Sequence, residues 1–418
     1  MTGPASGHTI GIVGGTWRAR VTPSGALVAM DGSVILDWWV AAEDRWHTPA
    51  REPTCRQRLV EGVPVVETAI RVPGGDVVQT VYAVADGGGL AVVALQNRSP
   101  APIAVALSRR DLLTSHPPAT VPVQGGDAPP DALVLPIGHR STVVVAIAPD
   151  RSGPGLLPSG LPKPEQVVRG WLRQTEVGAD VRLPESPAVA LPTLRSRLLL
   201  DGPPAADEPV PFLVAVAELG RLGVDVEPSV EAAAVAADEL ARLTRDRSAP
   251  VPWLVDAGLA AAGEVFGRAG HRRGVEDVAA ARAGRSDVEP VPLAPAGDLT
   301  DLAWALRRVA VERSGAVDLF PASVPPAWRG HAVEAYRVPI GAGMLAVALR
   351  WHGTRPAVLW EIDGPGATVL RCSGLDPAWS TSTARGEALL AEPGTACTLR
   401  GDPTASGGEV GTSAPLIG

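Results

Sequence analysis

The sequence predicts a multidomain α+β protein, in which an N-terminal antiparallel β-sandwich is followed by a central α-hairpin region and a small C-terminal β-sandwich. Its 418 residues are enough for about two to four domains, and 45% of them are hydrophobic, so sizeable cores can form. Short runs rich in Val, Ile and Thr occupy the first third of the chain and return after residue 316. Longer segments with apolar residues at helical spacing lie between them.

Residues 8–150 are expected to form the N-terminal sandwich, because short β-type runs recur there between Gly, Pro and Asp. Polar and apolar side chains partly alternate within residues 65–72, which predicts a sheet with one face in water. The triplet Gly87-Gly88-Gly89 predicts a hairpin turn. The expected strands are residues 25–30, 34–40, 63–72, 77–85, 90–97, 103–107, 132–136 and 141–148.

Residues 151–186 are expected to be a Pro- and Gly-rich linker that carries one helix, 164–175, with an apolar stripe around Trp171. Residues 187–315 then predict paired antiparallel helices separated by Pro and Gly. The expected helices of this region are residues 187–201, 207–222, 228–245, 251–269, 273–283 and 298–314.

The C-terminal part returns to β structure over residues 316–400, with strand patterns at 343–350 and 357–361. Residues 401–418 are rich in Gly, Ser, Thr and Pro, which predicts a disordered tail. Helices of the central region carry apolar sides that must be covered, so we expect Trp171 and Trp304 to be buried between domains.

Charge and cysteine content exclude several classes of protein. A net charge of −8 argues against a nucleic-acid or anionic-membrane surface, and no run of about 18 uncharged apolar residues predicts a membrane span. Three cysteines are too few for a disulfide framework or a four-cysteine zinc site, and the histidines are scattered. The first residues lack the basic and long apolar regions of a signal peptide. We therefore expect a cytoplasmic protein without a cofactor or a metal site.

Two stretches resemble the six-hairpin glycosidase superfamily of the glucoamylase, trehalase and glycogen-debranching type. In the first, GWL at 170–172 leads to VRLPE at 181–185 and RSRLLL at 195–200, which resembles a linker helix, an LPD-like turn and a first toroid helix. In the second, PPAW at 325–328 precedes VALRWHG at 347–353 and LWE at 359–361, which is similar to the closing β-domain of bacterial members.

The resemblance implies a toroid of helical hairpins with its active site at the mouth, where the general acid and the general base lie on different loops. The expected helical region, residues 187–315, holds about half of such a toroid. That cleft would therefore be open or covered by another part of the protein. The resemblance supports the fold more strongly than the activity.

Glycoside hydrolysis with inversion needs two carboxylates about 6.5–9.5 Å apart, and the acid needs a raised pKa. Glu289 lies just before the last expected helix, roughly where the resemblance places the base, and Asp207 and Glu208 lie on the first hairpin loop. The alternative is that Asp207 and Glu208 cap a helix and that Glu289 is solvated. No catalytic motif of the family surrounds these residues. Further loop carboxylates are Asp201, Asp256 and Asp287.

Tryptophan is over-represented, with 11 residues against 2 Tyr and 3 Phe. Indole faces stack on sugar rings, so some of them could line a saccharide groove. The alternative is that Trp fills the core of a protein with few other aromatic residues. The candidates for carbohydrate binding are Trp38, Trp39, Trp46, Trp253 and Trp328.

Three further groups are more easily explained by structure than by function. Trp351 and Trp360 could form a cross-strand aromatic pair, and His352 could form a polar pair with Glu361. His271 is expected to be a cation at a helix C-terminus. Residues 44–47, DRWH, are expected to be a polar loop between strands.

These patterns favour a degenerate glycosidase-like protein that binds a carbohydrate or a protein partner and has little or no hydrolase activity. One alternative is a glycoside hydrolase that acts on a glucoside-type oligosaccharide and completes its cleft as a homodimer. A second alternative is a scaffold that pairs with a catalytic homologue. Two inward carboxylates at inverting distance would favour the hydrolase, and a Trp-lined groove would favour binding.

Overall fold

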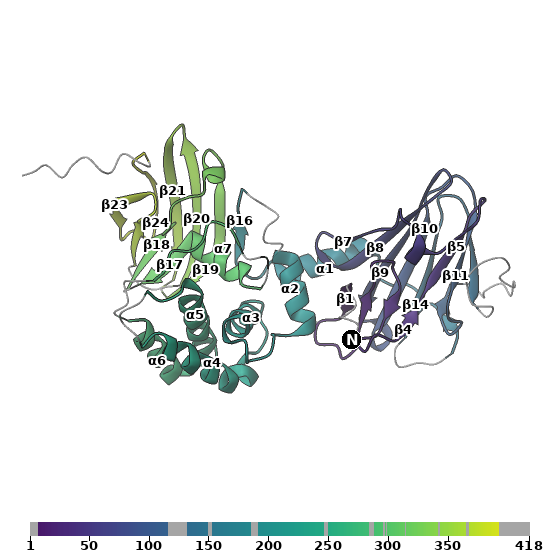
Figure 1. Cartoon of the computed structure of the whole chain (residues 1–418), viewed down its shortest axis with the longest axis horizontal. Helices are drawn as coiled ribbons and strands as arrows, with labels where there is room; N and C mark the ends of the chain where they lie inside the picture. Colours follow the sequence, from purple (N-terminus) through teal and green to yellow (C-terminus); the bar gives the residue numbers. More distant parts are fainter. Residues whose placement is uncertain are drawn as a thin grey trace, which may run out of the picture. The chain divides into compact units, whose positions relative to one another are not determined.

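Two units, each with sheets of its own, make up the described part of the chain (Figure 1). Unit 1 consists of Met1–Ala179, Pro187–Glu289 and Pro295–Ala303, and unit 2 consists of Asp180–Ser186, Pro290–Ala294 and Trp304–Gly418. The fold is mixed α+β, as the sequence predicts. The expected tail, 401–418, lies outside the described residues. The computed structural model describes residues 7–115, 132–148, 153–184, 191–245, 250–283, 288–295, 297, 299–313, 315–341, 343–364 and 368–392.

Unit 1 begins with three antiparallel sheets that share one hydrophobic core. The sheet orders are β1-β2-β3-β4, β13-β11-β5-β6 and β15-β12-β14-β10-β9-β8-β7, with one parallel pair, β12 and β15, at the edge of the last sheet. Side chains from all three sheets meet in the core, including Ile10, Trp38 and Val93. The strands are β1 (His8–Gly11), β2 (Arg18–Val21), β3 (Leu27–Val28), β4 (Val34–Leu36), β5 (Trp38–Ala41), β6 (Trp46–His47), β7 (Arg56–Val60), β8 (Val63–Val72), β9 (Gly75–Val84), β10 (Leu90–Asn97), β11 (Ile103–Leu107), β12 (Leu113–Thr114), β13 (Leu133–Ile137), β14 (Thr142–Ile147) and β15 (Gly155–Leu156).

The long strands match the sequence prediction closely, and the expected Gly-rich turn joins β9 to β10. The expectation of one wet face, however, is wrong for the start of β8. Val66 and Ile70 face the inner core, but Val63 and Val65 face a second cluster that the helices complete. Only from Glu67 onward does the outer face become partly exposed. The alternation of polar and apolar residues predicted the two faces of β8, but it could not show that helices distant in the sequence cover the outer face.

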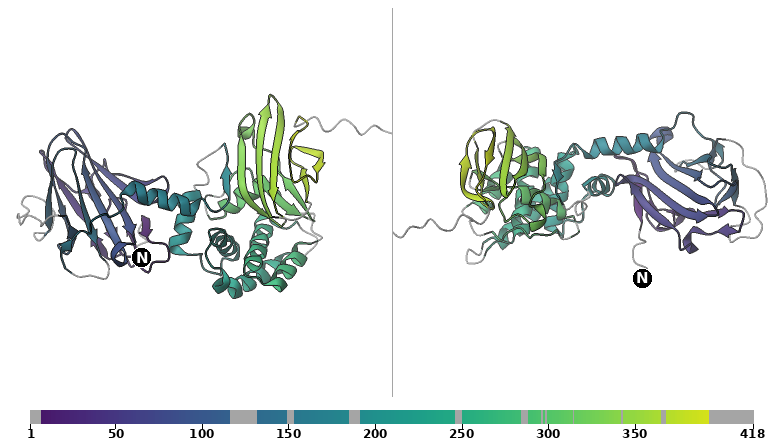
Figure 2. Two further views of the ribbon diagram at one scale, coloured as in Figure 1. Left: turned by 180° about the vertical axis from the view of Figure 1, so that it is seen from behind. Right: turned by 90° about the horizontal axis from the view of Figure 1, so that it is seen from above.

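Helix α1 (Pro164–Thr175) has the predicted bounds and packs on β8 and β9 (Figure 2). Trp171 is buried there, in the cluster that also holds residues of α2 (Leu191–Asp201) and α3 (Pro209–Arg221). Helix α2 lies close to strand β1 because Gly11 has no side chain and leaves room for Leu200. A Cβ at Gly11 would lie 3.1 Å from that leucine side chain.

The remaining helices of unit 1 pack as neighbours around α5 (Trp253–Arg268). Helix α5 contacts α3, α4 (Val230–Leu243) and α6 (Arg272–Arg282), so its buried residues lie on several sides of the helix. Asp256, expected in a loop, lies inside α5 and pairs with Arg282 at 3.0 Å. Asp287 lies outside the described residues. The helices predicted for this region therefore pack on one another, with α5 in contact with three of them.

Unit 2 contains a sheet of order β16-β19-β20-β21-β24 and a sheet of order β17-β18-β22-β23. Its first strand, β16, comes from the stretch after α1 and pairs antiparallel with β19, as Val181 opposite Ala335 shows. Trp304 is buried, and its indole N–H donates to the carbonyl oxygen of Pro292 at 2.8 Å. The strands are β16 (Asp180–Arg182), β17 (Ala310–Arg313), β18 (Ala316–Leu319), β19 (Val333–Ile340), β20 (Gly343–His352), β21 (Arg355–Asp363), β22 (Val369–Cys372), β23 (Asp376–Thr381) and β24 (Arg385–Leu389).

The last expected helix, 298–314, is shorter than the sequence predicts. Helix α7 (Asp301–Val309) ends where β17 begins, and β17 pairs antiparallel with β18. Gly315 adopts a left-handed φ of 74° between these strands. Tertiary pairing therefore overrides the helical pattern over the last residues of the segment.

Two expected side-chain pairs of unit 2 are wrong. Trp360 lies opposite Val347 and Gly386 and makes an edge contact with Trp379, with ring centroids 5.3 Å apart, whereas Trp351 lies opposite Pro356. His352 lies opposite Arg355. Glu361 lies opposite Ala346 and Arg385. The β20–β21 register, which the sequence did not reveal, separates both pairs.

Within the described ranges, no helix has the length and apolar character needed to cross a membrane.

Candidate functional site

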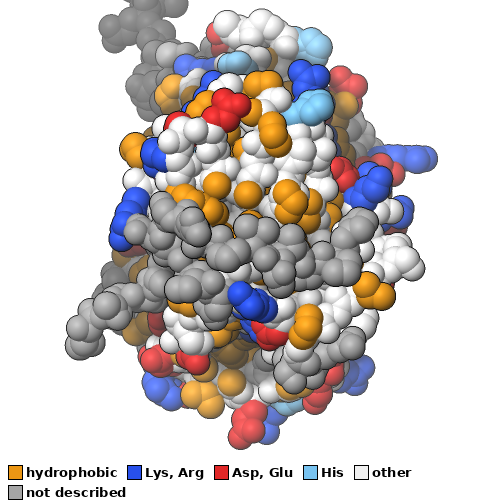
Figure 3. Space-filling model, turned by 90° about the vertical axis from the view of Figure 1, so that its right-hand side faces the viewer, with side chains coloured by type: hydrophobic (Ala, Val, Ile, Leu, Met, Phe, Trp, Pro, Cys, Tyr) orange, Lys and Arg blue, Asp and Glu red, His pale blue; other side chains and the backbone are white. Residues whose placement is uncertain are grey.

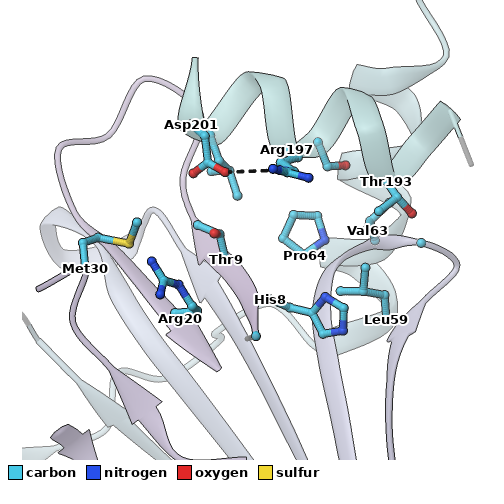
Figure 4. A pocket seen from close by; sticks show the side chains of 14 residues that line it. His8, Thr9, Arg20, Met30, Leu59, Val63, Pro64, Thr193, Arg197 and Asp201 are labelled. Carbon is cyan, nitrogen blue, oxygen red and sulfur yellow. Dashed lines mark ion pairs between the residues drawn. The ribbon is translucent and has the colours of Figure 1, made fainter. Parts of the chain in front are cut away.

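Two neighbouring cavities of unit 1 lie against helix α2. The first has a volume of about 540 Å³ and is lined by β1, β2, the β7–β8 turn and α2 (Figure 4). The second has a volume of about 620 Å³ and is lined by α2, the loop that follows it and residues near the start of α7. Thr193, Arg197 and Asp201 line both. We call the two cavities together the α2 groove.

Helical spacing brings the α2 side chains to the groove. Residues 193, 197 and 201 are four apart, so they lie on one face of the helix. Gly62, at the β7–β8 turn, has a φ of 74°, and a Cβ there would lie 2.7 Å from Thr193 Oγ1. This glycine therefore allows the turn to approach the helix and close one side of the first cavity.

The first cavity has basic groups on both of its walls. His8 and Thr9 of β1 and Arg20 of β2 lie on the strand side, and Arg197 lies on the helix side (Figure 4). Arg197 Nε is 3.9 Å from Asp201 Oδ2, a long and exposed pair that contributes little to stability. Burial lowers the pKa of His8, which favours the neutral imidazole at neutral pH.

Ser196 is the least satisfied polar residue of the first cavity. It is 2% exposed, and its hydroxyl has no hydrogen-bond partner within the part of the chain that the structure describes. Buried polar groups without a partner are rare and costly in folded proteins. The oxygen atom is shielded from solvent, so a bound molecule could satisfy it only if the serine side chain turned toward the cavity.

The second cavity is acidic and has an apolar rim. Asp201, Glu208 and Asp301 line it together with Pro203, Pro204, Pro211, Leu198 and Leu299. Asp301 is buried, and its Oδ1 accepts a hydrogen bond of 2.8 Å from the backbone N–H of Gly297. Asp201 and Glu208 are exposed and open to a ligand. The cavity therefore offers hydrogen-bond acceptors next to apolar surface.

Of the three carboxylates predicted to be catalytic, only Glu208 lines the α2 groove. Asp207 and Glu289 are exposed and do not line either of its cavities. The backbone N–H of Glu289 donates to the carbonyl oxygen of Val251 at 2.9 Å, so the segment is tied to the start of α5. The groove instead brings Glu208 together with Asp201, which the sequence had suggested only as a further loop carboxylate.

Most of the predicted sugar-stacking tryptophans are covered by protein. Trp38 is fully buried, with its indole N–H donating to the carbonyl oxygen of Ser24 at 2.9 Å, and Trp39 is buried beside Ala106. Trp328 is buried, with the Arg308 guanidinium 5.3 Å from its ring centroid. Their faces are therefore closed to a sugar ring in this structure. Trp46 and Trp253 are half-buried.

A histidine network at residues 44–47 was not anticipated, and the expected loop is wrong for Trp46 and His47, which form strand β6. His47 is buried, and its two ring nitrogens each lie 3.1 Å from a carboxylate oxygen, one of Asp44 and one of Glu52. Hydrogen bonds from Arg45 lower the pKa of Glu52, and the bond to His47 lowers that of Asp44. The charges of this network satisfy one another, which indicates that it fixes the loop.

His271 also differs from the expectation. It is the N-cap of α6, and its Nδ1 accepts a hydrogen bond of 3.2 Å from the backbone N–H of Gly274. The side chain therefore caps the N-terminus of α6, whereas the sequence predicts a role at a helix C-terminus. Only Ala269 and Gly270 separate the end of α5 from this N-cap.

Unit 2 has a cavity of its own, of about 600 Å³, lined by residues such as Asp180, Glu361 and Asp363. Its exposed aromatic residue, Tyr336, has its ring covered by Arg182, 5.7 Å from the ring centroid. The α2 groove is therefore the stronger candidate for a binding site.

Among the described residues, no three His, Cys, Asp or Glu side chains form a group that could hold a metal ion. A scan against protein-family models and a search of curated proteins both returned no match to this chain. The groove must therefore be interpreted from its own chemistry. The sequence signal that could have revealed it is the four-residue spacing of Thr193, Arg197 and Asp201.

Proposed function

We propose that this protein binds a carbohydrate in the α2 groove and has little or no hydrolase activity. The observation that carries the proposal is that one face of α2 contributes Thr193, Arg197 and Asp201 to two adjoining cavities at once. Each cavity lies within the roughly 300–1,000 Å³ range of small-molecule sites. An oligosaccharide could therefore occupy both and contact the same helix throughout.

The lining suits a polyol because donors, acceptors and apolar surface alternate. Arg197 can donate to sugar oxygens, and the carboxylates of Asp201 and Glu208 can accept from hydroxyl groups. Proline side chains at 203, 204 and 211 offer apolar surface to the C–H faces of a sugar ring. Helices α2–α6 and the start of α7 are then the shortened hairpin region of a glycosidase-like fold.

One observation favours the hydrolase alternative. Asp201, Glu208 and Asp301 line the same cavity, so a general acid and a general base could both be drawn from it. Asp301 is already hydrogen-bonded to the backbone. Asp201 and Glu208 are exposed, so neither has the burial that raises the pKa of a general acid. We therefore place binding first.

The test is a calorimetric binding screen and a turnover assay with α- and β-linked glucosides, mannosides and trehalose. We expect binding without turnover, weakened about tenfold by Asp201→Asn, because a hydrogen bond to a charged group contributes about 1.5–3 kcal/mol. Glu289→Gln, an exposed carboxylate outside the groove, is the control and should bind normally. Turnover that is abolished by Glu208→Gln would establish the hydrolase instead. The absence of both binding and turnover would refute both the binding proposal and the hydrolase alternative.

A further inference from the structure

We propose that the first cavity of the α2 groove recognises the negative group of an acidic sugar, either a sugar acid or a sugar phosphate. This inference rests on the proposed carbohydrate binding and adds the class of ligand. The shared chemistry is an oxyanion carried on a polyol, and two cationic side chains on opposite walls of the cavity point to it.

The walls supply the charges that an oxyanion needs. Arg20 extends from β2 and Arg197 from α2, so a group bound in the cavity lies between two guanidiniums that come from different elements (Figure 4). Guanidinium groups bind carboxylates and phosphates through paired N–H bonds. His8 adds a further ring nitrogen on the strand side. Arg197 is 78% exposed at its side chain and can turn toward a ligand at little cost.

The buried hydroxyl of Ser196 is an independent indication. Helix α2 places it in the lining of the same cavity, 2% exposed and without a partner among the described residues. A hydroxyl donates well to a negatively charged oxygen, and such charge-assisted bonds are stronger than neutral ones. Because the Oγ atom is shielded from solvent in this structure, the serine side chain would have to turn toward the cavity to make this bond.

Asp201 explains why the ligand should be a polyol as well as an anion. Its carboxylate lies in the lining of the first cavity and would repel a bare phosphate. A sugar hydroxyl can instead donate to it while the oxyanion engages the arginines. Thr9 and Thr193 offer further hydroxyl groups in the same cavity.

The two cavities differ in sign, which gives the ligand an orientation. The first contains Arg20 and the second contains Glu208 and Asp301, while Arg197 and Asp201 are shared by both. An acidic sugar would place its charged end in the first cavity and neutral sugar units in the second. The face of the sandwich in Figure 3 shows no such separation, since acidic and basic side chains are interspersed there.

The experiment measures calorimetric affinity for D-glucuronate, glucose 6-phosphate, D-glucose and inorganic phosphate. We expect at least one acidic sugar to bind about tenfold more tightly than glucose, since charge-assisted bonds are the stronger ones. Arg20→Gln and Arg197→Gln should each lower the affinity for the acidic sugar by a larger factor than the affinity for glucose. Ser196→Ala should weaken only the acidic sugar. The control is Arg273→Gln, a change at an 88% exposed side chain on α6.

The outcomes separate the two proposals. Equal affinity for glucose and both acidic sugars would overturn the inference and leave the proposed function standing. Phosphate binding as tightly as glucose 6-phosphate would overturn it too, because the site would then be a plain anion site. No binding of any sugar would overturn the proposed function and this inference with it. A preference for glucuronate over glucose 6-phosphate, or the reverse, identifies which acidic group is recognised. Thermal unfolding of each variant verifies that it is folded.

Discussion

The two units of this protein are built in different ways, although both are mixtures of helix and strand. The sandwich of unit 1 comes from one continuous stretch, with β8, β9 and β10 joined by short turns and paired in sequence order. Unit 2, in contrast, includes a strand, β16, that lies far before its other strands in the chain. Continuous pairing can be inferred from local patterns, whereas discontinuous pairing depends on contacts that no local pattern contains.

The electrostatic centres differ as well. In unit 1, Glu218 is fully buried and lies 2.5 Å from Arg195 Nε and 2.8 Å from Arg221 Nη1. Arg195 also donates to the carbonyl oxygens of Thr175 and Ala179, so it joins α2 and α3 to the end of α1. In unit 2, Glu334 pairs with Arg350, whose side chain is 39% exposed. Buried pairs become costly when one partner is removed, whereas exposed pairs do not.

The largest effect is expected from Glu218→Ala. The substitution leaves the buried guanidiniums of Arg195 and Arg221 without their carboxylate, which should cost about 4–5 kcal/mol of the free energy of unfolding of unit 1. Urea unfolding followed by circular dichroism measures it. Glu264→Ala, which removes a partly exposed partner of the same Arg221, is the matched control and should cost about 1 kcal/mol. Equal losses would show that burial does not set the effect.

Two tryptophan substitutions test whether the units are energetically distinct. Trp171→Ala and Trp304→Ala each remove a buried indole, one from each unit, and each should cost about 3–4 kcal/mol. In differential scanning calorimetry each variant should lower a different transition. If both lower the same single transition by equal amounts, the division into two units has no thermodynamic counterpart.

Acid should affect unit 1 more than unit 2. Burial would raise the pKa of Glu218, but Arg221 and Arg195 outweigh it and hold that pKa below the ordinary 4.5. A lowered pKa stabilises the folded state above the unfolded value and loses that contribution as the pH falls through the folded one. Stability of unit 1 should therefore decline below about pH 4.5. Unfolding curves between pH 7 and 3 measure this, and Glu218→Gln should flatten the decline.

The smallest effect is expected at Gly62. In Gly62→Ala a Cβ would meet Thr193 Oγ1 at 2.7 Å on a backbone with φ of 74°, which should cost about 1–2 kcal/mol. Gly88→Ala has a similar φ of 86° with open space around it, so it isolates the backbone strain and should cost about 1 kcal/mol. Thermal melts compare the two. Identical shifts would mean that the turn does not press on α2.

Sequence patterns predicted much of the local structure. The bounds of α1, β8, β10 and β11 agree with the prediction, because their apolar periodicity is strong and their ends carry turn residues. Short strands such as β6 and β12 have too few residues to show a period. The end of α7 was misjudged because pairing with β18 overrides helical propensity.

The candidate site was predictable only in part. Glu208 was predicted because a carboxylate on a loop is a candidate general acid or base. His8 and Arg20 were missed because they lie on strands, where the sequence does not distinguish them from ordinary surface residues. Their approach to Arg197 depends on how β1 and β2 pack against α2, a helix that follows them much later in the sequence. The tryptophans were misleading for the opposite reason, since their type suggested stacking and their strand positions buried them.

The early position of β16 has a consequence for synthesis of the chain on the ribosome. Arg182 reaches Glu334 across 152 residues, and this strand emerges long before the partner it pairs with. Until β19 is made, β16 has no ladder to join, while the nascent helices that follow it can already pack on the sandwich. Such long-range closure slows folding. The later strands of unit 2 therefore have to incorporate a strand that was made before the helices of unit 1.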